Sequence, residues 1–406
     1  MHKPTLIALL SFATVGIIPA RTEDFQFSVA AGDFDRRETV VTFPLPPSQT
    51  WRTSFLLQSS TGEQLPVQMD ASRTLSFIEP DLPKGETKNY RLAPAKTHAA
   101  PAAGVQATRA GTRLEFRVHG KPVVSYQAEP GEFPRADIKP IYRRGGYLHP
   151  VFSPSGKLVT DDFALNHTHH HGIWFPWTKT EFEGRQPDFW NMGEGKGRVE
   201  FVTLNQSWSG AVHGGFIAQH RFVDLLAPEP KTALNETWEV KIYGLTGRAK
   251  PHWIFDLTST QTCASASALK LAKYHYGGMG FRGNAQWDGK DNVFFLTSEG
   301  ETDRVKGNET RGRWCHIGGK VDGELTGVAI LCHPENFRAP QPMRLHPTEP
   351  FFCYAPSQLG DWEITPGRPY VSRYRFIVAD GPPDKNEIER LWNDYAHPPN
   401  VVVGAK

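Results

Sequence analysis

The sequence lacks the features that mark several common functional classes. Its 45 basic and 43 acidic residues nearly cancel, and no run of like charges stands out, so binding to nucleic acid or to an anionic membrane surface is not expected. It contains no Gly-rich phosphate loop and no regular alternation of strands with helices, which disfavours nucleotide-binding folds. Its four cysteines form no CxxC pair, which argues against a cysteine zinc site. These absences favour small, neutral partners.

Long hydrophobic runs are also missing, except at the N-terminus. Residues 5–18 are almost uncharged, follow Lys3 and end at Pro19-Ala20, a pattern typical of a signal peptide over residues 1–20. A membrane span needs about 20 apolar residues, more than this run supplies. We therefore expect an exported protein, periplasmic or extracellular, with no membrane span. An oxidising compartment would permit disulfides, with three alternative pairings, among Cys263, Cys315, Cys332 and Cys353.

The chain is rich in short segments of alternating polar and apolar residues. Such segments, separated by Pro- and Gly-containing turns, predict a small β domain over residues 21–92. Residues 93–104 are rich in Ala and Pro without a hydrophobic period and read as a linker. Alternation then returns repeatedly, as in 113–118 and 370–378. We expect an all-β protein whose main domain, residues 105–400, is a large antiparallel β-sandwich.

One segment near the C-terminus has a helical period. Asp384 can cap this helix, and Glu387 follows three residues later. Its apolar positions fall on one helical face, formed by Ile388, Leu391, Trp392 and Tyr395. The sequence therefore predicts a C-terminal helix.

The densest group of ionisable and aromatic residues lies between Asn166 and Asn191. It includes four histidines within five positions, and imidazoles can bind metals, donate or accept hydrogen bonds and move protons near neutral pH. In an extended strand, His167, His169 and His171 would point to one side and His170 to the other. Three imidazoles on one side could hold zinc, copper or iron, or could bind a polyhydroxy substrate and transfer protons. A histidine-rich surface loop or a satisfied polar core is the structural alternative.

Tryptophans and carboxylates follow the histidines. The indole faces of Trp174, Trp177 and Trp190 suit the C–H faces of sugar rings, although core packing explains each of them equally well. Paired carboxylates could act as acid and base, as glycoside cleavage usually requires; the candidates are Glu181, Glu183 and Asp188. In an extended run Lys179 would share a face with both glutamates, and its charge would favour a base over an acid. Two surface glutamates are the simpler alternative.

Distant segments could complete such a site. The glycine-rich segment 274–283 would let the backbone approach a ligand, and its Arg282 could bind hydroxyls or a carboxylate; a bulged strand is the alternative. Segments 308–314 and 333–336 are weaker candidates, since ordinary turns explain them. Arg344 and His346 are weaker still.

Several motifs together resemble a known family. They are HPVFSPSGKLVTDD (149–162), HHHGIW (169–174), GR (184–185) with DFWN (188–191), YGG (276–278), RGRW (311–314) and HP (333–334). These motifs are similar to those of an exported bacterial family labelled PmoA or methane oxygenase-like, whose activity is not established. The resemblance covers about residues 105–395.

A second, looser resemblance is to galactose mutarotase-like proteins, whose β-supersandwich carries an Asn-His-x-His-Gly-Gly motif. Residues 166–169 match its first half, but His170 and His171 precede Gly172, and Ile173 replaces the second glycine. That resemblance implies a supersandwich fold and a sugar ligand. It also implies a distant histidine as acid, for which His275 or His333 could serve.

The leading hypothesis is a secreted carbohydrate-active enzyme: a glycoside hydrolase, lyase or sugar epimerase. The expected catalytic residues are His167, His169, His170, Glu181, Glu183, Asp188 and His275. The expected substrate contacts are His149, Trp174, Trp177, Lys179, Arg185, Trp190, Asn191, Tyr276, Arg282, Arg311 and His333. The alternatives are a non-catalytic carbohydrate-binding protein and a metal-dependent enzyme, in which a divalent metal would be held by His167, His169 and His171.

Overall fold

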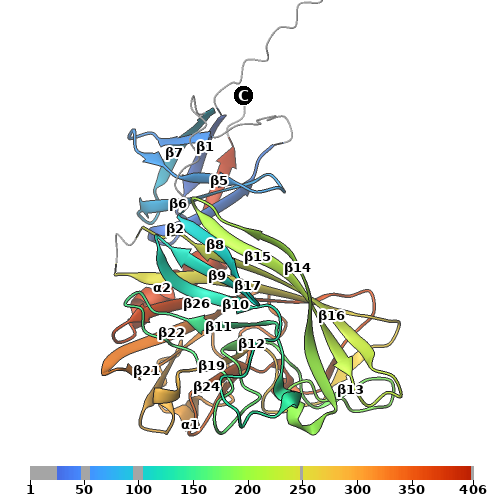
Figure 1. The fold of residues 1–406 in the computed structure, drawn as a ribbon. Coiled ribbons are helices and arrows are strands. Elements are labelled where there is room, and N and C mark those ends of the chain that lie inside the picture. Colours follow the sequence, from blue (N-terminus) through green and yellow to red (C-terminus); the bar gives the residue numbers. More distant parts are fainter. Residues whose placement is uncertain (1–24, 47–54, 95–103, 247–249, 404–406) are drawn as a thin grey trace, which may run out of the picture.

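A computed structural model describes residues 25–46, 55–94, 104–246 and 250–403. Antiparallel β-strands dominate it, in two sandwich-like bodies (Figure 1). This architecture confirms the predicted all-β class with a large antiparallel sandwich. The expected signal peptide, residues 1–20, and most of the expected linker, residues 93–104, lie outside the described residues.

The larger body consists mainly of two eight-stranded antiparallel sheets. The front sheet contains, in spatial order, β23 (Met343–Leu345), β24 (Phe351–Tyr354), β19 (Gly280–Arg282), β12 (Ile173–Trp174), β11 (Tyr147–Val151), β10 (Lys121–Gln127), β9 (Arg113–Val118) and β8 (Val105–Ala110). The back sheet contains β14 (Gly197–Trp208), β15 (His213–Asp224), β16 (Lys231–Tyr243), β17 (His252–Cys263), β26 (Tyr370–Asp380), β22 (Glu324–Cys332), β21 (Trp314–Val321) and β20 (Val293–Thr297). A three-stranded sheet adds β13 (Thr180–Glu181), β18 (Leu269–Leu271) and β25 (Trp362–Ile364).

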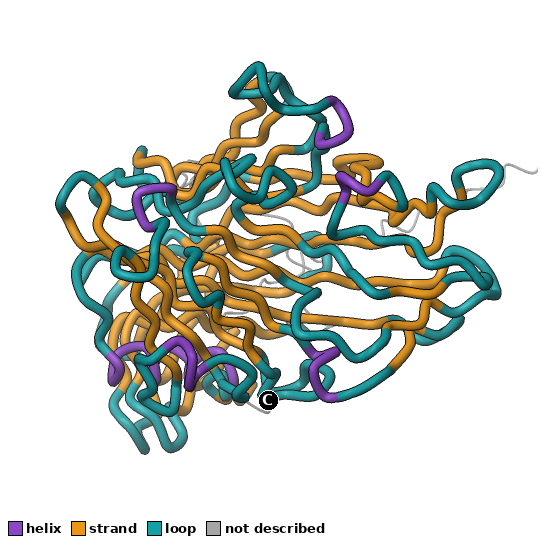
Figure 2. Tube along the Cα trace, turned by 90° about the horizontal axis from the view of Figure 1, so that it is seen from below, coloured by secondary structure: helices purple, strands orange, loops and turns teal. Residues whose placement is uncertain are grey.

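The two large sheets bury one hydrophobic core between them. Alternate residues of each front strand point into it, including Ile173, Phe281 and Phe352. Their neighbours Trp174 and Phe351 instead belong to a separate aromatic cluster on the outer face. Because side chains alternate along a strand, the front sheet has one face for the core and one free to carry a site. Figure 2 shows loops gathered around the rims of the strands.

The smaller body pairs two sheets around a core of its own. One sheet contains β27 (Asn400–Val403), β1 (Phe25–Ala30), β7 (Thr87–Pro94), β3 (Phe55–Ser59) and β4 (Gln64–Leu65), and the other contains β2 (Arg36–Pro44), β6 (Thr74–Leu82) and β5 (Val67–Met69). Phe27, Phe77 and Tyr90 pack within its core. The last described strand, β27, pairs with the first, β1 (Figure 1). The sequence pattern did not predict this return of the chain.

The predicted C-terminal helix is confirmed as α2 (Lys385–Ala396). The Asp384 side chain accepts hydrogen bonds from the backbone N–H groups of Asn386 and Glu387, as a capping residue should. The apolar face of the helix packs with residues of the back sheet, in a cluster that includes Leu391, Trp392, Leu331 and Ile377. The other helix of the described residues, α1 (Arg304–Gly307), is a single turn.

A buried ion pair joins the smaller body to α2. Arg36 of β2 donates to the Asp394 carboxylate at 2.9 Å, and the side chains of both residues are 2% exposed. Thr39 also donates its hydroxyl to Asp394, and Arg36 reaches the carbonyl oxygen of His397 at 2.7 Å. This network is one of several contacts between the two bodies, which also include hydrogen bonds from Gln68 to His213 and from Thr246 to Glu38.

The cysteines and the helices settle two further points about the fold. The four cysteines are all free thiols, so none of the three pairings considered from the sequence forms. Within the described part of the chain, no helix is both long and apolar enough to cross a membrane.

Replacing Asp394 with alanine tests the buried network. The variant leaves the Arg36 guanidinium buried without its carboxylate, so we expect the free energy of unfolding to fall by about 3–5 kcal/mol. Glu194→Ala, which removes the exposed partner of Lys196, should cause no measurable change. Chemical denaturation followed by circular dichroism checks both, and equal stabilities of the two variants would refute the assignment.

Candidate functional site

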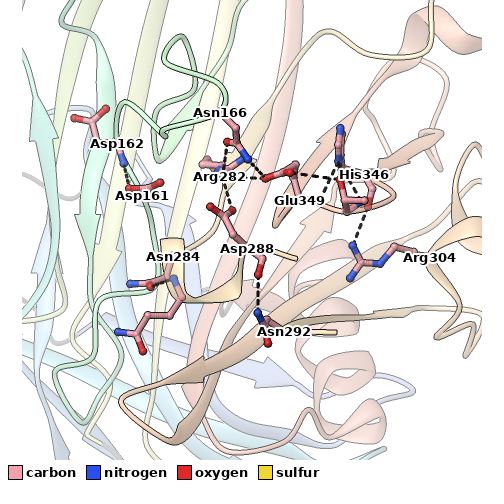
Figure 3. Close-up of polar contacts among 12 residues, drawn as sticks. Asp161, Asp162, Asn166, Arg282, Asn284, Asp288, Asn292, Arg304, His346 and Glu349 are labelled. Atoms are coloured by element: carbon pink, nitrogen blue, oxygen red, sulfur yellow. Dashed lines mark hydrogen bonds and ion pairs between the residues drawn. The ribbon is translucent and has the colours of Figure 1, made fainter. Parts of the chain in front are cut away.

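The outer face of the front sheet carries the candidate site. In the strand register, Trp174 of β12 pairs with Gly280 of β19, and Arg282 of β19 pairs with Phe351 of β24. These outward residues form a floor of two aromatic rings and one guanidinium. Turns that precede β12, follow β19 and precede β24 place polar side chains around Arg282 (Figure 3).

Arg282 is a fully buried cation surrounded by oxygen atoms. Its side chain is 0% exposed, and its Nη2 lies 2.5 Å from the Asp288 carboxylate and 3.3 Å from Glu349. Nη2 also donates to the side-chain oxygen of Asn166 at 3.2 Å, while the Asn166 amide donates to Glu349. The Nε and Nη1 of Arg282 are buried without a partner among the described residues. Burying a charge is costly without such partners, so Arg282 holds the two carboxylates near one point.

Asp288 and Glu349 form a coupled carboxyl pair. Burial, and to a smaller degree the charge and hydrogen bond of Glu349, raises the pKa of Asp288 to about 6, against the opposing charge of Arg282. For Glu349, burial alone would raise the pKa, but the hydrogen bond from Asn166 and the charge of Arg282 outweigh burial and lower it. The pKa values of the two carboxyls therefore shift in opposite directions, and Asp288 is the one that keeps its proton to higher pH. A carboxyl that titrates near 6 can serve as an acid or a base.

The turn before β24 supports Glu349. The Glu349 backbone N–H donates to Nδ1 of His346 at 3.0 Å, and the His346 carbonyl oxygen accepts from Arg304 at 3.1 Å. On the other side of Arg282, the carbonyl oxygen of Asp288 accepts from Asn292 at 2.6 Å (Figure 3). Both carboxylates are therefore positioned through their backbone as well as through Arg282.

The histidine segment is not the extended strand that the sequence suggested. Residues 164–169 form a tight turn closed by a bridge between Ala164 and His167. The His170 ring stacks on His167 with centroids 4.7 Å apart and lies 4.7 Å from His169. His171 points elsewhere, to Asp162 at 2.5 Å. The predicted alternation was wrong because a turn, unlike a strand, does not alternate its side chains.

The predicted metal ligands are consequently not assembled. His171 is separated from His167 and His169, and among the described residues no group of three or more His, Cys, Asp or Glu side chains could hold a metal ion. Substrate contact or proton transfer, and a purely structural role, stay as the predictions for His167, His169 and His170.

The clustered histidines are held neutral. Burial lowers the pKa of His169 to about 4, with a further contribution from the charge of His167. Burial also lowers the pKa of His170 well below its usual value, and burial together with the charge of Arg282 lowers that of His167. The Nδ1 atoms of His167 and His170 are buried without partners among the described residues. Buried polar atoms are nearly always hydrogen-bonded, so these nitrogens indicate a place where a ligand or water belongs.

A polar cavity of about 630 Å³, which we call the site cavity, is lined by Tyr276, whose ring packs against the aromatic cluster of Trp174 and Phe351. Arg282, Asp288, Glu349 and His167 are not among its lining residues. Several of the predicted site residues line it: Lys179, Glu181, Asp188, Asn191 and Tyr276. Asp188 accepts from Thr178 at 2.9 Å and from the Asn191 amide at 2.8 Å, which in turn donates to the Tyr276 hydroxyl at 3.2 Å. Trp190 packs between Tyr276 and His170, at 5.2 and 6.0 Å, and so connects the cavity wall to the histidines.

Other predicted site residues lie away from these groups. Glu183 and Arg185 form a surface network, because Lys231 and Ser267 hydrogen-bond Glu183 and lower its pKa to about 2. Arg311 donates to backbone carbonyl oxygens of residues 338–340. His333 packs against Tyr395 of α2. None of these four reaches Arg282 or the site cavity, so their assignment to the site was wrong.

The tryptophans pack rather than line a cleft. Trp174 and Trp177 are 0% exposed and Trp190 is 2% exposed, so none offers a free face to a sugar. Trp177 lies in the core between the sheets and donates to Gln261 at 2.7 Å. The core-packing alternative is therefore correct, and Trp362 of β25, which the sequence did not single out, lines the site cavity instead.

Two further predicted residues, His275 and His149, lie near the site without lining the site cavity. His275 is half-buried beside Tyr276, with ring centroids 4.9 Å apart, and the charge of Arg344 adds to burial in lowering its pKa. His149 of β11 hydrogen-bonds Thr160 at 3.0 Å and lines a second cavity. Asp288 and Glu349 were missed, and His346 was rated weak. Their only local signal is a position in Gly- or Pro-containing turns, since Arg282 gathers them only on folding.

Comparison with known proteins gives the family of the chain but no activity. A model described as a family of unknown function (DUF6807) matches residues 113–393, and the chain belongs to that family. No curated protein matches the chain. The matched segment covers both large sheets from β9 onward, with Arg282, the carboxyl pair and the clustered histidines.

The neutral histidines predict how stability depends on pH. An unfolded histidine takes up a proton near its usual pKa, whereas the folded cluster does not until lower pH, so acidification favours unfolding. We expect the free energy of unfolding to fall between pH 7 and pH 4, and His169→Gln to reduce that slope. Nitrogen NMR of the imidazoles should show the cluster uncharged at pH 6, and a His169 or His170 ring titrating between pH 6 and 7 would contradict this.

Proposed function

We propose that this member of a family of unknown function is an exported enzyme that performs general acid–base chemistry on a carbohydrate. The observation that carries the proposal is the buried Arg282 guanidinium, which holds the carboxylates of Asp288 and Glu349 at 2.5 and 3.3 Å. A partly exposed carboxyl with a raised pKa, beside a buried guanidinium, is typical of a reactive centre.

Asp288 and His167 would carry out the two proton transfers. Asp288, the more exposed partner, is the proposed acid, because its pKa near 6 keeps it partly protonated in weakly acidic solution. His167 is the proposed base, since its imidazole is neutral and the charges of Glu349 and Arg282 both act on it. Arg282 and Glu349 are positioning residues: the first is fully buried, and the second is tied to Asn166.

The geometry favours proton transfer on the sugar over hydrolysis between flanking carboxyls. Glycosidases of the usual kind place their two carboxyl groups about 5–10 Å apart, with the scissile bond between them. Asp288 and Glu349 hydrogen-bond to each other, which leaves no room for a glycosidic oxygen or a water on opposite faces of a ring. Sugar epimerisation or elimination, in which a proton leaves carbon and another is delivered, therefore fits the pair better.

The site cavity supports a polyhydroxy substrate. Its lining combines carboxylate, amide and amino groups with the rings of Tyr274, Tyr276 and Trp362. Such a mixture can hydrogen-bond hydroxyl groups and cover the apolar face of a sugar ring. The half-exposed Trp362 and Tyr276 would take the stacking role first expected of the buried tryptophans. The resemblance to mutarotase-like proteins, which also implies a sugar ligand, stays a prediction.

Proton exchange into sugars tests the proposal directly. The protein is incubated in deuterated water with a panel of neutral and acidic mono- and disaccharides, and carbon-bound deuterium and new products are read by NMR. We expect exchange or product from at least one sugar. Asp288→Asn and His167→Gln should each lower the rate by about 10²–10⁴-fold, the usual contribution of a general acid or base.

Glu183→Gln is the matched control, because it changes a carboxylate of the surface network outside the site. Its rate should equal that of the unchanged protein. Sugar binding without exchange or product across the panel would contradict the enzyme proposal and leave a carbohydrate-binding protein. Equal rates in the Asp288→Asn and Glu183→Gln variants would exclude Asp288 as the acid.

A further inference from the structure

A second cavity on the outer face of the front sheet has not been given a role. It encloses about 400 Å³, and we call it the arginine cavity after its most unusual lining residues. These are Arg113, Arg135, Arg143 and Arg144, which line it together with His149 and Asp161. Four arginines line this cavity against three carboxyl residues, Glu132, Asp161 and Asp162, so its lining carries a small excess of positive charge.

Three of these arginines form no direct ion pair. In the described part of the chain, no carboxylate lies within salt-bridge distance of Arg113, Arg143 or Arg144, although the charges of Glu236 and Asp162 act on Arg144. Arg144 is 4% exposed and donates only to the carbonyl oxygens of Gly145 and Gly146, at 3.2 and 3.4 Å. Burial lowers its pKa to about 10, because the charges of Glu236 and Asp162 offset the cost of burying the cation only in part.

The fourth arginine also has an unused donor. Arg135 pairs through Nε with Asp137 at 3.1 Å, while its Nη2 is buried without a partner among the described residues. Arg143 lies against the face of Phe133, 5.0 Å from the ring centroid, which orients its guanidinium without neutralising it. The cavity therefore holds several planar donor groups that lack acceptors.

The acidic residues that line the cavity do not supply those acceptors. Asp162 accepts from His171 and from the Tyr147 hydroxyl at 2.8 Å. Asp161 accepts from the backbone N–H of Asp162 at 2.9 Å. Glu132 is exposed and pairs with none of the four arginines among the described residues. An added anion would thus meet donors whose charge is not already matched.

We infer that the arginine cavity binds an anionic group of the substrate, a carboxylate or a sulfate ester on a sugar. Arginine donors are arranged as planar forks that match the two oxygens of such groups. This inference rests on the proposed carbohydrate substrate. The cavity lies next to the Arg282 centre, because Asp161 lines it and donates its backbone N–H to the Arg282 carbonyl oxygen at 3.1 Å (Figure 3). The substrate class is therefore an acidic sugar.

Calorimetric titration with matched sugars tests the inference. The probes are glucuronate, glucose 6-sulfate and glucose, each at low and at high salt. We expect one or both acidic sugars to bind about tenfold to a hundredfold more tightly than glucose, as one or two charge-assisted hydrogen bonds provide. The preference should shrink at high salt, and the tighter of the two acidic sugars identifies the anionic group.

The double variant Arg113→Gln/Arg143→Gln should lose this preference. Both residues are exposed, so their removal should not prevent folding, whereas Arg144 is buried. Arg221→Gln, an exposed arginine of the back sheet that pairs with Glu200, is the matched control and should keep the preference. Equal binding of glucose and both acidic sugars, or an unchanged preference in the double variant, would overturn the inference.

Binding and turnover separate this inference from the proposed function. If Asp288→Asn retains the preference for acidic sugars but proton exchange is absent from every protein, the cavity assignment stands and the enzyme proposal fails. If neutral sugars undergo exchange while acidic ones gain no affinity, the enzyme proposal stands and the cavity assignment fails.

Discussion

The buried guanidinium of Arg282 is the constraint on which the candidate site depends. A cation with no exposed surface must be surrounded by acceptors, and this requirement brings together three segments far apart in the chain: the turn at Asn166, the turn at Asp288 and the turn at Glu349. The front sheet makes this possible, because its alternation sends Phe281 into the core and leaves Arg282 on the outer face. The β-sandwich thus fixes one charge, and that charge positions the side chains of three turns.

The site around Arg282 contrasts with its neighbour, the arginine cavity. At Arg282 two carboxylates exceed the single positive charge, so the pair retains a proton and suits acid–base work. In the arginine cavity the arginines outnumber the carboxyl residues, so the excess charge is positive. The backbone contact from Asp161 to Arg282 places the two environments side by side. One ligand could occupy both environments if its reactive part were neutral and another part were anionic. The clustered neutral histidines lie beside the Arg282 site.

More of the fold than of the candidate site could be predicted from the sequence. Alternation in segments such as 113–118 specified strands, and the Asp384 cap with its apolar stripe specified α2, because both signals are local. The extended histidine strand was wrong because the bridge from Ala164 to His167 is a turn contact that alternation cannot reveal. Asp288 and Glu349 lie 6 and 67 residues beyond Arg282, and no local pattern links them. Similarly, Trp174 and Glu183 carry suitable chemistry, but only packing shows that one is buried and the other belongs to a surface network.

Infrared spectroscopy of the carboxyl groups tests the central claim most directly, because it detects the proton of Asp288 without a substrate. A titration of the protein labelled at aspartate should show a protonated carboxyl that persists to about pH 6, and Asp288→Asn should remove that contribution while those of Asp161 and Asp394, whose pKa values burial also raises, stay. Glu349→Gln should shift the titration of Asp288 to lower pH, because the neighbouring negative charge is gone. An aspartate spectrum with no protonated carboxyl above pH 5, or one unchanged by Asp288→Asn, would contradict the account.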